Sequence, residues 1–126
     1  MEFPAQLRYS PDHEWIRIDG ETGTIGITAF AAHELSDIVY VELPAVGRQL
    51  QAGTTFGAIE SVKTVSDLLA PVSGTVVAVN TALADRPELV TADPYAEGWI
   101  IQLRVSDPAE LGALLDADAY RIQAGG

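Results

Sequence analysis

Short segments in which apolar and polar residues alternate constrain the fold of this chain more than any other feature. Such alternation, rich in β-branched residues, is typical of strands with one buried face. Three segments show it, and the residues predicted to share a face are Ile16 and Ile18 in 15–19, Val39, Val41 and Leu43 in 37–43, and Trp99, Ile101, Leu103 and Val105 in 99–105. The chain is therefore predicted to consist mainly of short strands.

Further short apolar runs lie between these segments. They occupy residues 24–27, 55–62, 65–70 and 74–79, and Gly, Pro, Ser or Asp separates them. Many short strands with frequent turn signals predict a sandwich or a barrel. A length of 126 residues is enough for one domain and too short for two of ordinary size, so residues 1–126 are predicted to form a single domain.

Helices are predicted at two main places. Thr28 can cap a short helix that runs through Leu35. Near the end, Asp107, Pro108 and Glu110 combine a cap residue, a proline at the first helical position and a glutamate three residues after the cap. Leucines 111, 114 and 115 then follow a helical spacing, which predicts a C-terminal helix packed on the sheet. A weaker candidate is a turn over residues 87–90.

The composition excludes several classes of function. The chain has 7 Lys+Arg against 18 Asp+Glu, a formal net charge of −11, which disfavours binding to a phosphate backbone. It has no cysteine, so a disulfide framework and a thiolate nucleophile are excluded. The start shows neither a secretory nor a transit pattern, and the longest apolar runs, such as Val76–Val79, are far below the roughly 20 residues that span a membrane. We therefore expect no nucleic-acid partner, no membrane partner and an intracellular location.

Motifs for metal, nucleotide or serine chemistry are incomplete. His13-Glu14 and His33-Glu34 both lack the second histidine of the H-E-x-x-H zinc motif, so no metal site is expected. The glycines fit neither nucleotide-binding pattern, and no G-x-S-x-G motif occurs.

Lysine usage is unusual. Six of the seven cationic residues are arginines, and Lys63 is the only lysine, whereas an average chain of this length would contain roughly seven. Its neighbours, Ser61 and Thr64, suit a tight exposed hairpin between two β-prone arms. A bias toward arginine would explain the composition; a need for a nucleophilic primary amine would explain the position.

The sequence around Lys63 resembles the lipoylation site of the glycine cleavage system H-protein family. The similarity rests on Glu-Ser-Val-Lys at 60–63, Ser-Asp at 66–67 and Ala-Pro-Val-Ser-Gly at 70–74. It extends over nearly the whole chain, through His-Glu-Trp at 13–15, the segment 37–44 and Gly-Trp at 98–99. Gly47 lies 16 residues before Lys63 and Gly74 lies 11 after it, as in lipoyl domains generally. Ser36-Asp37 departs from the usual Gly-acid pair, so we expect the backbone to turn differently there.

The resemblance implies a fold and a function. The fold would be a barrel-sandwich hybrid, a flattened barrel of two antiparallel sheets, with a few short helices and a C-terminal helix. Lipoate would be joined by an amide to Lys63 and accept an aminomethyl group from glycine decarboxylase (the P protein). The aminomethyltransferase (T protein) would take this group, and dihydrolipoyl dehydrogenase (L protein) would reoxidise the dithiol. The chain would be a non-catalytic carrier, monomeric, and cytoplasmic in a bacterium or in the mitochondrial matrix of a eukaryote.

The resemblance also nominates residues around the lysine. Glu14 and Asp67 are expected to line a cleft that holds the loaded arm, together with Asp12. Glu34 and His33 are weaker candidates, because the expected histidine is displaced by one residue. Glu60 and Asp67 are expected to help the lipoate-attaching enzyme recognise the hairpin, since they lie three residues before and four after Lys63.

Four alternatives remain open to different degrees. A biotinyl domain usually has methionines beside its lysine, where this chain has Val62 and Thr64. A lipoyl domain of a 2-oxo-acid dehydrogenase usually has Asp-Lys-Ala and a Pro/Ala-rich linker, which are absent. A diverged H-like carrier for lipoate relay or sulfur transfer is a third alternative, and the sequence contains no feature that argues strongly against it. An unmodified interaction module would not need to keep Lys63.

Overall fold

Two antiparallel sheets form most of the molecule. The computed structural model describes residues 2–35 and 37–124, and the expected difference in the turn at Ser36 lies outside them. The six-stranded sheet has the order β1-β2-β3-β9-β8-β5, and the three-stranded sheet has the order β4-β6-β7. The strands are β1 (Arg8–Tyr9), β2 (Glu14–Asp19), β3 (Thr22–Ile27), β4 (Ile38–Glu42), β5 (Gln49–Leu50), β6 (Thr55–Ser61), β7 (Val65–Leu69), β8 (Gly74–Val79) and β9 (Ile101–Val105).

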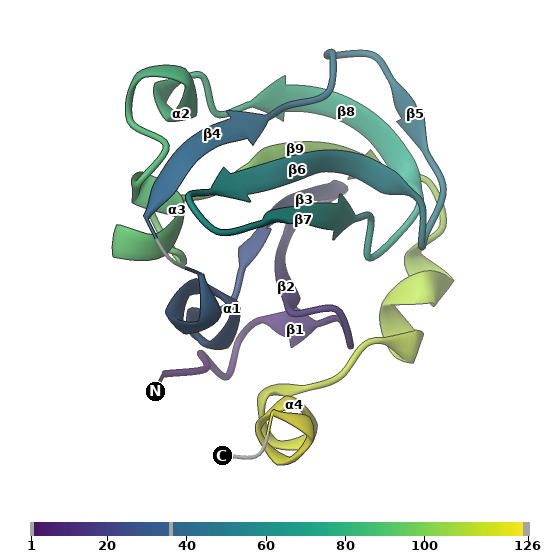
Figure 1. Cartoon of the computed structure of the whole chain (residues 1–126). Helices are drawn as coiled ribbons and strands as arrows, with labels where there is room; N and C mark the ends of the chain where they lie inside the picture. The colour runs from purple at the N-terminus through teal and green to yellow at the C-terminus, as the bar shows by residue number, and fades with distance from the viewer. Residues whose placement is uncertain (1, 36, 125–126) are drawn as a thin grey trace.

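The sheets pack face to face over one apolar core (Figure 1). Ile25 and Leu103 enter it from the six-stranded sheet, and Val41, Ile59 and Leu68 enter it from the three-stranded sheet, all nearly inaccessible to solvent. The prediction of a mostly β fold with two antiparallel sheets is confirmed. The flattened barrel is not: within the described residues no ladder joins one sheet to the other, so the architecture is an open sandwich.

The predicted alternation of residues 37–43 is wrong in strand β4. The register with β6 shifts between Ile38 and Tyr40, which marks a bulge. A bulge reverses the side to which the following residues point. Ile38 and Val41 consequently face the core, whereas Val39 is 51% exposed and does not share the face of Val41. The other predicted strands lie within one or two residues of their expected bounds. The largest differences are of two residues, for example at β9, which begins at Ile101 instead of Trp99.

Short helices connect the strands. They are α1 (Ala29–Glu34), α2 (Ala82–Asp85), α3 (Leu89–Ala92), the 3-10 helix η1 (Pro108–Ala113) and α4 (Ala117–Gln123). The Thr28 cap is confirmed, because its hydroxyl accepts the N–H of Ala31 at 3.2 Å. None of the described helices has the length and apolarity required to cross a membrane.

The C-terminal helix lies later in the chain than predicted. Residues 108–113 form a single 3-10 segment, because Leu115 exchanges two backbone hydrogen bonds of 2.8 Å with Tyr9 and so draws the chain into an extended conformation. Glu110 does not complete a capping box: its carboxylate accepts the backbone N–H and the hydroxyl of Ser73, at 2.7 and 3.0 Å. The true C-terminal helix is α4, which Asp116 caps through the N–H of Ala119.

Candidate functional site

Lys63 lies at the tip of the β6–β7 hairpin. Glu60 pairs with Val65 in the last rung of the ladder, and Ser61 and Thr64 close the turn. Lys63 is exposed, as are Val62 and Thr64 beside it. The predicted hairpin is confirmed. The turn lies on the same side of the molecule as α1 and α3 (Figure 1).

Hydrogen bonds fix the backbone on both sides of the lysine. The N–H of Ser61 donates to the carbonyl of Thr64 at 2.8 Å, and the Ser61 hydroxyl bridges both backbone groups of Thr64, at 3.1 and 3.2 Å. The N–H of Val62 donates to the carbonyl of Asp37 at 3.0 Å, which ties the tip to the start of β4. The side chain of Lys63 is therefore presented from a rigid base.

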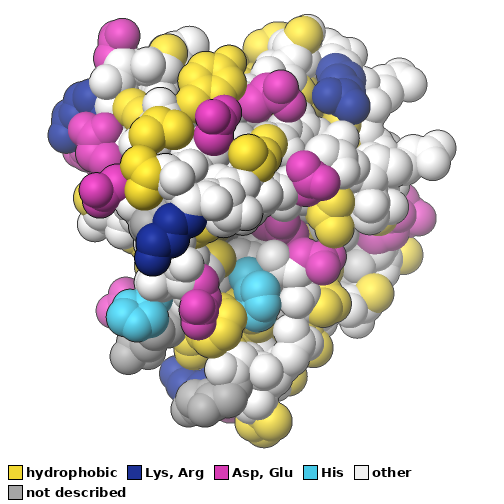
Figure 2. Space-filling model, in the orientation of Figure 1, with side chains coloured by type: hydrophobic (Ala, Val, Ile, Leu, Met, Phe, Trp, Pro, Cys, Tyr) yellow, Lys and Arg dark blue, Asp and Glu magenta, His cyan; other side chains and the backbone are white. Residues whose placement is uncertain are grey.

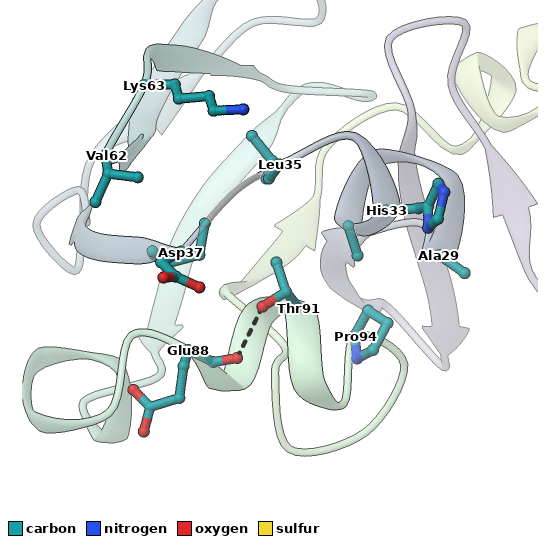
Figure 3. Close-up of a pocket in the computed structure, with 11 residues that line it drawn as sticks. Ala29, His33, Leu35, Asp37, Val62, Lys63, Glu88, Thr91 and Pro94 are labelled. Atoms are coloured by element: carbon teal, nitrogen blue, oxygen red, sulfur yellow. Dashed lines mark hydrogen bonds between the residues drawn. The ribbon is translucent and has the colours of Figure 1, made fainter.

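Two hollows adjoin Lys63. The broader one, of about 1040 Å³, lies between the hairpin tip, α1 and α3. Figure 3 shows Lys63 on one side of it and the carboxyl group of Glu88 on the opposite side. A smaller hollow of about 260 Å³ is lined by Lys63, Ser61 and Thr64 on the hairpin and by His33, Glu34 and Leu35 on and after α1.

A third hollow, of about 270 Å³, is a neighbour of the second one, since Glu34 and Leu35 line both. It gathers three of the nominated acids, Asp12, Glu34 and Asp67, from the loop before β2, from α1 and from β7. We call it the carboxylate hollow. Its remaining walls are largely apolar and include Ile27, Phe30, Ile59 and Leu68. Figure 2 shows both histidines on the face drawn, with acidic side chains between and beside them.

Glu14 lies behind this hollow and does not line it. Its side chain is buried, at 2% exposure. The Ser10 hydroxyl donates to Oε1 at 2.7 Å, and the N–H of Leu69 donates to Oε2 at 3.1 Å. Burial is the main cause that raises the pKa of Glu14 to about 7, while both hydrogen bonds act in the opposite direction. The carboxyl group thus ties β2, in the six-stranded sheet, to the edge strand β7 that carries Asp67.

His13 forms part of the wall of the carboxylate hollow. Its backbone has a φ of 71°, in the left-handed region that residues with a side chain seldom adopt. Its Nδ1 lies 2.7 Å from the hydroxyl of Tyr120, and its ring lies 4.7 Å from that of Phe30. Burial lowers the pKa of His13, and the negative charges of Asp12 and Glu34 oppose this.

Tyr120 connects helix α4 to this wall and was not predicted from sequence. Its buried hydroxyl also lies 2.7 Å from the Thr28 hydroxyl, which caps α1, and its ring stacks on Tyr9 at 4.8 Å. Ser10, which holds Glu14, was missed as well. The only sequence signal for either residue is its type, because the partners of Tyr120 lie far away in the chain and the role of Ser10 depends on the burial of Glu14.

The remaining nominated residues lie apart from the carboxylate hollow. His33 lines the two hollows beside Lys63. Glu60 is exposed on β6, directly across from Val65, close to the tip. The structure thus brings Asp12, Glu34 and Asp67 together, with Glu14 behind them and Glu60 on the outer face of the hairpin.

Comparison with known proteins shows the family to which the chain belongs. The family model for the glycine cleavage H-protein matches residues 7–124. A glycine cleavage system H protein from Symbiobacterium thermophilum is 60% identical over 117 residues, which cover 93% of this chain and 91% of the relative. A probable glycine cleavage system H protein from Haloarcula marismortui is 53% identical, with 98% and 97% covered.

A solved structure shows the same fold. The crystal structure of a glycine cleavage system H protein from Mycobacterium marinum superposes with a TM-score of 0.91 at 42% identity, covering 98% of this chain and 100% of that one. The family match, together with this fold, places the chain in the class of carrier proteins. The chain belongs to the glycine cleavage H-protein family, the lipoate carriers of the glycine cleavage system.

Proposed function

We propose that Lys63 is the residue to which lipoate is attached, through an amide to Nζ. Three observations support this: Lys63 is the only lysine, its side chain is exposed, and hydrogen bonds at Ser61 and Val62 fix its base. Amide formation requires a nucleophilic amine, which a guanidinium does not provide at neutral pH. The rigid tip is the single observation that carries the proposal, since a carrier must present its group from a fixed, accessible point.

Membership of this family supports the partners that we propose. Lipoate held by Lys63 would supply a dithiolane for carrying an aminomethyl group between the P and T proteins, and the L protein would restore its oxidised form. The chain itself performs no catalysis in this scheme. The net charge of −11 supports electrostatic steering toward enzymes with basic rims. We also propose that residues 1–126 act as one monomeric carrier domain in the cytoplasm, as the bacterial relatives suggest.

The test of the attachment site compares the wild-type protein with Lys63→Arg. Both are incubated with a lipoate-attaching enzyme, ATP and lipoate, and their intact masses are measured. The wild type gains one lipoyl group and the variant gains none, and only the modified wild type supports glycine cleavage with the P, T and L proteins. A lipoyl mass on Lys63→Arg, or an unmodified wild type, contradicts the proposal.

We further propose that the carboxylate hollow shelters the cargo. An aminomethyl group carries an amine that is protonated near neutral pH, and carboxylates hold such a cation by charge-assisted hydrogen bonds. Asp12, Glu34 and Asp67 line the hollow, which shares Glu34 and Leu35 with the hollow beside Lys63. The apolar walls limit the access of water. Glu14, with both oxygens already engaged, contributes by holding β7 in place.

Release of formaldehyde from the loaded protein tests this shelter. Replacing Asp67 by Asn, or Glu34 by Gln, removes a carboxylate from the hollow and is expected to raise the rate of non-enzymatic release severalfold. Glu14→Gln removes no carboxylate from the hollow and keeps hydrogen bonds to Ser10 and Leu69, so it should raise the rate less than either of these variants. Asp19→Asn, an exposed acid at the other end of β2, is the matched control and should leave the rate unchanged. Equal rates in all these proteins would refute the shelter without affecting lipoate attachment.

A further inference from the structure

The outer face of the three-stranded sheet carries two rows of side chains across β4, β6 and β7. The row next to the tip is Tyr40, Glu60 and Val65, because Tyr40 pairs with Glu60 and Glu60 pairs with Val65. The next row that faces outward is Glu42, Ala58 and Asp67, and on the edge strand β7 Asp67 also borders the carboxylate hollow. Between them, Val41 and Ile59 face the core. The described helices and strands leave both rows accessible.

Apolar exposure is concentrated at the end of this face that bears Lys63. Tyr40, Val62 and Val65 are 54%, 64% and 60% exposed, and the bulge in β4 exposes Val39 as well. Single exposed apolar residues are ordinary, but a group of them beside the residue to be modified marks an interaction surface. We call Val39, Tyr40, Val62 and Val65 the tip patch.

Apart from Lys63 itself, the charged side chains in the two rows beside the tip patch are acidic. Glu60 stands inside its row, and Glu42 and Asp67 flank it in the next row, while neither row contains a cation. The complementary surface therefore has an apolar centre with Lys or Arg side chains around it.

The state of the lysine decides which partner this surface fits. Enzymes that act on the cargo meet it at the end of a long arm and can remain clear of the hairpin. The enzyme that acylates Lys63 meets an unmodified lysine, and its reactive group must come within bonding distance of Nζ. Because the hydrogen-bonded tip holds the base of Lys63 in place, that enzyme must contact the residues beside it.

We propose that the tip patch is the docking surface of the enzyme that acylates Lys63, with Tyr40 as its main anchor. This rests on the proposed attachment of lipoate to Lys63. In the acylation step, Nζ attacks the carbonyl carbon of an acyl-adenylate and forms the C–N bond. The bond from that carbon to the phosphate oxygen breaks, and AMP leaves with the electron pair. The amine then loses a proton. Tyr40 anchors because it is the one aromatic side chain of the tip patch, and aromatic residues dominate the energy of interfaces.

The test measures lipoylation kinetics of the unmodified full chain with a purified lipoate protein ligase, lipoate and ATP, by intact mass. Tyr40→Thr removes the ring but keeps a residue suited to a strand. Val77→Thr is the matched control, since Val77 is 36% exposed on β8 of the other sheet. We expect Tyr40→Thr to lower kcat/KM by about tenfold, mainly through KM, and the control to stay within about twofold.

A second measurement does not depend on the reaction. Lys63→Arg should inhibit lipoylation of the wild type competitively, and Lys63→Arg combined with Tyr40→Thr should inhibit about tenfold more weakly. Glu60→Gln with Asp67→Asn should slow lipoylation severalfold at low salt and approach the wild-type rate at high salt. Circular dichroism confirms that each variant is folded.

The outcomes separate the two proposals. Two results together would overturn the docking surface while the attachment site stands. Tyr40→Thr would be lipoylated at the same rate as Val77→Thr. Lys63→Arg would also inhibit equally well with and without Tyr40→Thr. A wild-type protein that is not lipoylated at all overturns the attachment site first. Slower lipoylation of Tyr40→Thr, together with weaker inhibition by the double variant, supports the docking surface.

Discussion

Two ionisable groups that lie near opposite ends of β7 differ in their exposure to solvent. At the hairpin tip before this strand, Lys63 is exposed. At its far end, the Glu14 carboxyl is buried, receives hydrogen bonds from Ser10 and Leu69, and has a pKa raised to about 7. We call the second region the Glu14 junction. The tip leaves the amine of Lys63 accessible, and the junction fixes the strand that leads from the tip.

The comparison separates a group that is accessible to solvent from a group that stabilises the fold. A reactive amine needs solvent and space, so its own side chain contributes little to folding. A buried carboxyl group that bridges two sheets is sensitive to any change, because an unmatched polar group in the interior costs about 1–3 kcal/mol. Changes at the junction should therefore alter stability, and changes at the tip should alter modification.

The largest expected effect on stability is at Glu14. Its pKa is higher in the folded protein than the usual value of 4.5, so the native state binds more protons than the unfolded state between about pH 4.5 and 7. The free energy of unfolding therefore falls as pH rises through this window, by about 3 kcal/mol if the whole difference is realised. In Glu14→Gln the amide oxygen accepts the N–H of Leu69 and the amide nitrogen donates to Ser10, so this fall should disappear.

Urea unfolding of both proteins at a series of pH values between 4.5 and 8 measures the effect. Asp19→Asn, whose carboxyl group is exposed, serves as the control and should keep the pH dependence of the wild type. An unchanged slope in Glu14→Gln would mean that Glu14 titrates normally and that the junction is not the buried link described above.

A smaller effect is expected at Tyr120, next to the junction. Tyr120→Phe removes the buried hydroxyl that joins His13 to Thr28, and leaves the ring stacked on Tyr9. Loss of a buried hydroxyl with two partners should cost about 1–2 kcal/mol of unfolding free energy. Tyr40→Phe, at a half-exposed tyrosine of the tip patch, should cost less than about 0.5 kcal/mol. Urea unfolding at one pH measures both, and equal costs for the two would contradict the role of the Tyr120 hydroxyl.

Much of the fold could be predicted because it depends on local patterns. Alternation placed most of the strands, and Thr28 marked the start of α1. The errors arose where distant segments decide. Nothing near Val39 signals the bulge, which depends on pairing with β6. The helical spacing after Asp107 is real, but pairing of Leu115 with Tyr9 ends the helix after a short 3-10 segment.

The candidate site divides in the same way. Lys63 was predictable, because the only lysine lies on a hairpin that its own neighbours define. The acids were harder to distinguish: Glu14 and Asp67 were both nominated by position, and only the fold shows that Asp67 lines the carboxylate hollow while Glu14 is buried behind it. Ser10 and Tyr120, which set the environment of Glu14 and His13, become visible only when the sheets and α4 are assembled.

The smallest expected effect on stability is at the tip, in Lys63→Arg. The side chain of Lys63 is exposed, and the hydrogen bonds that hold the turn come from the backbone and from Ser61, so none is lost. Arginine keeps the charge, and the unfolding free energy should change by no more than a few tenths of a kcal/mol, although we expect lipoylation to be abolished. Thermal and urea unfolding measure this against Glu14→Gln at a pH of about 8, above the pKa of Glu14. A loss of more than about 1 kcal/mol in Lys63→Arg would show that the lysine supports the hairpin, and the contrast between tip and junction would fail.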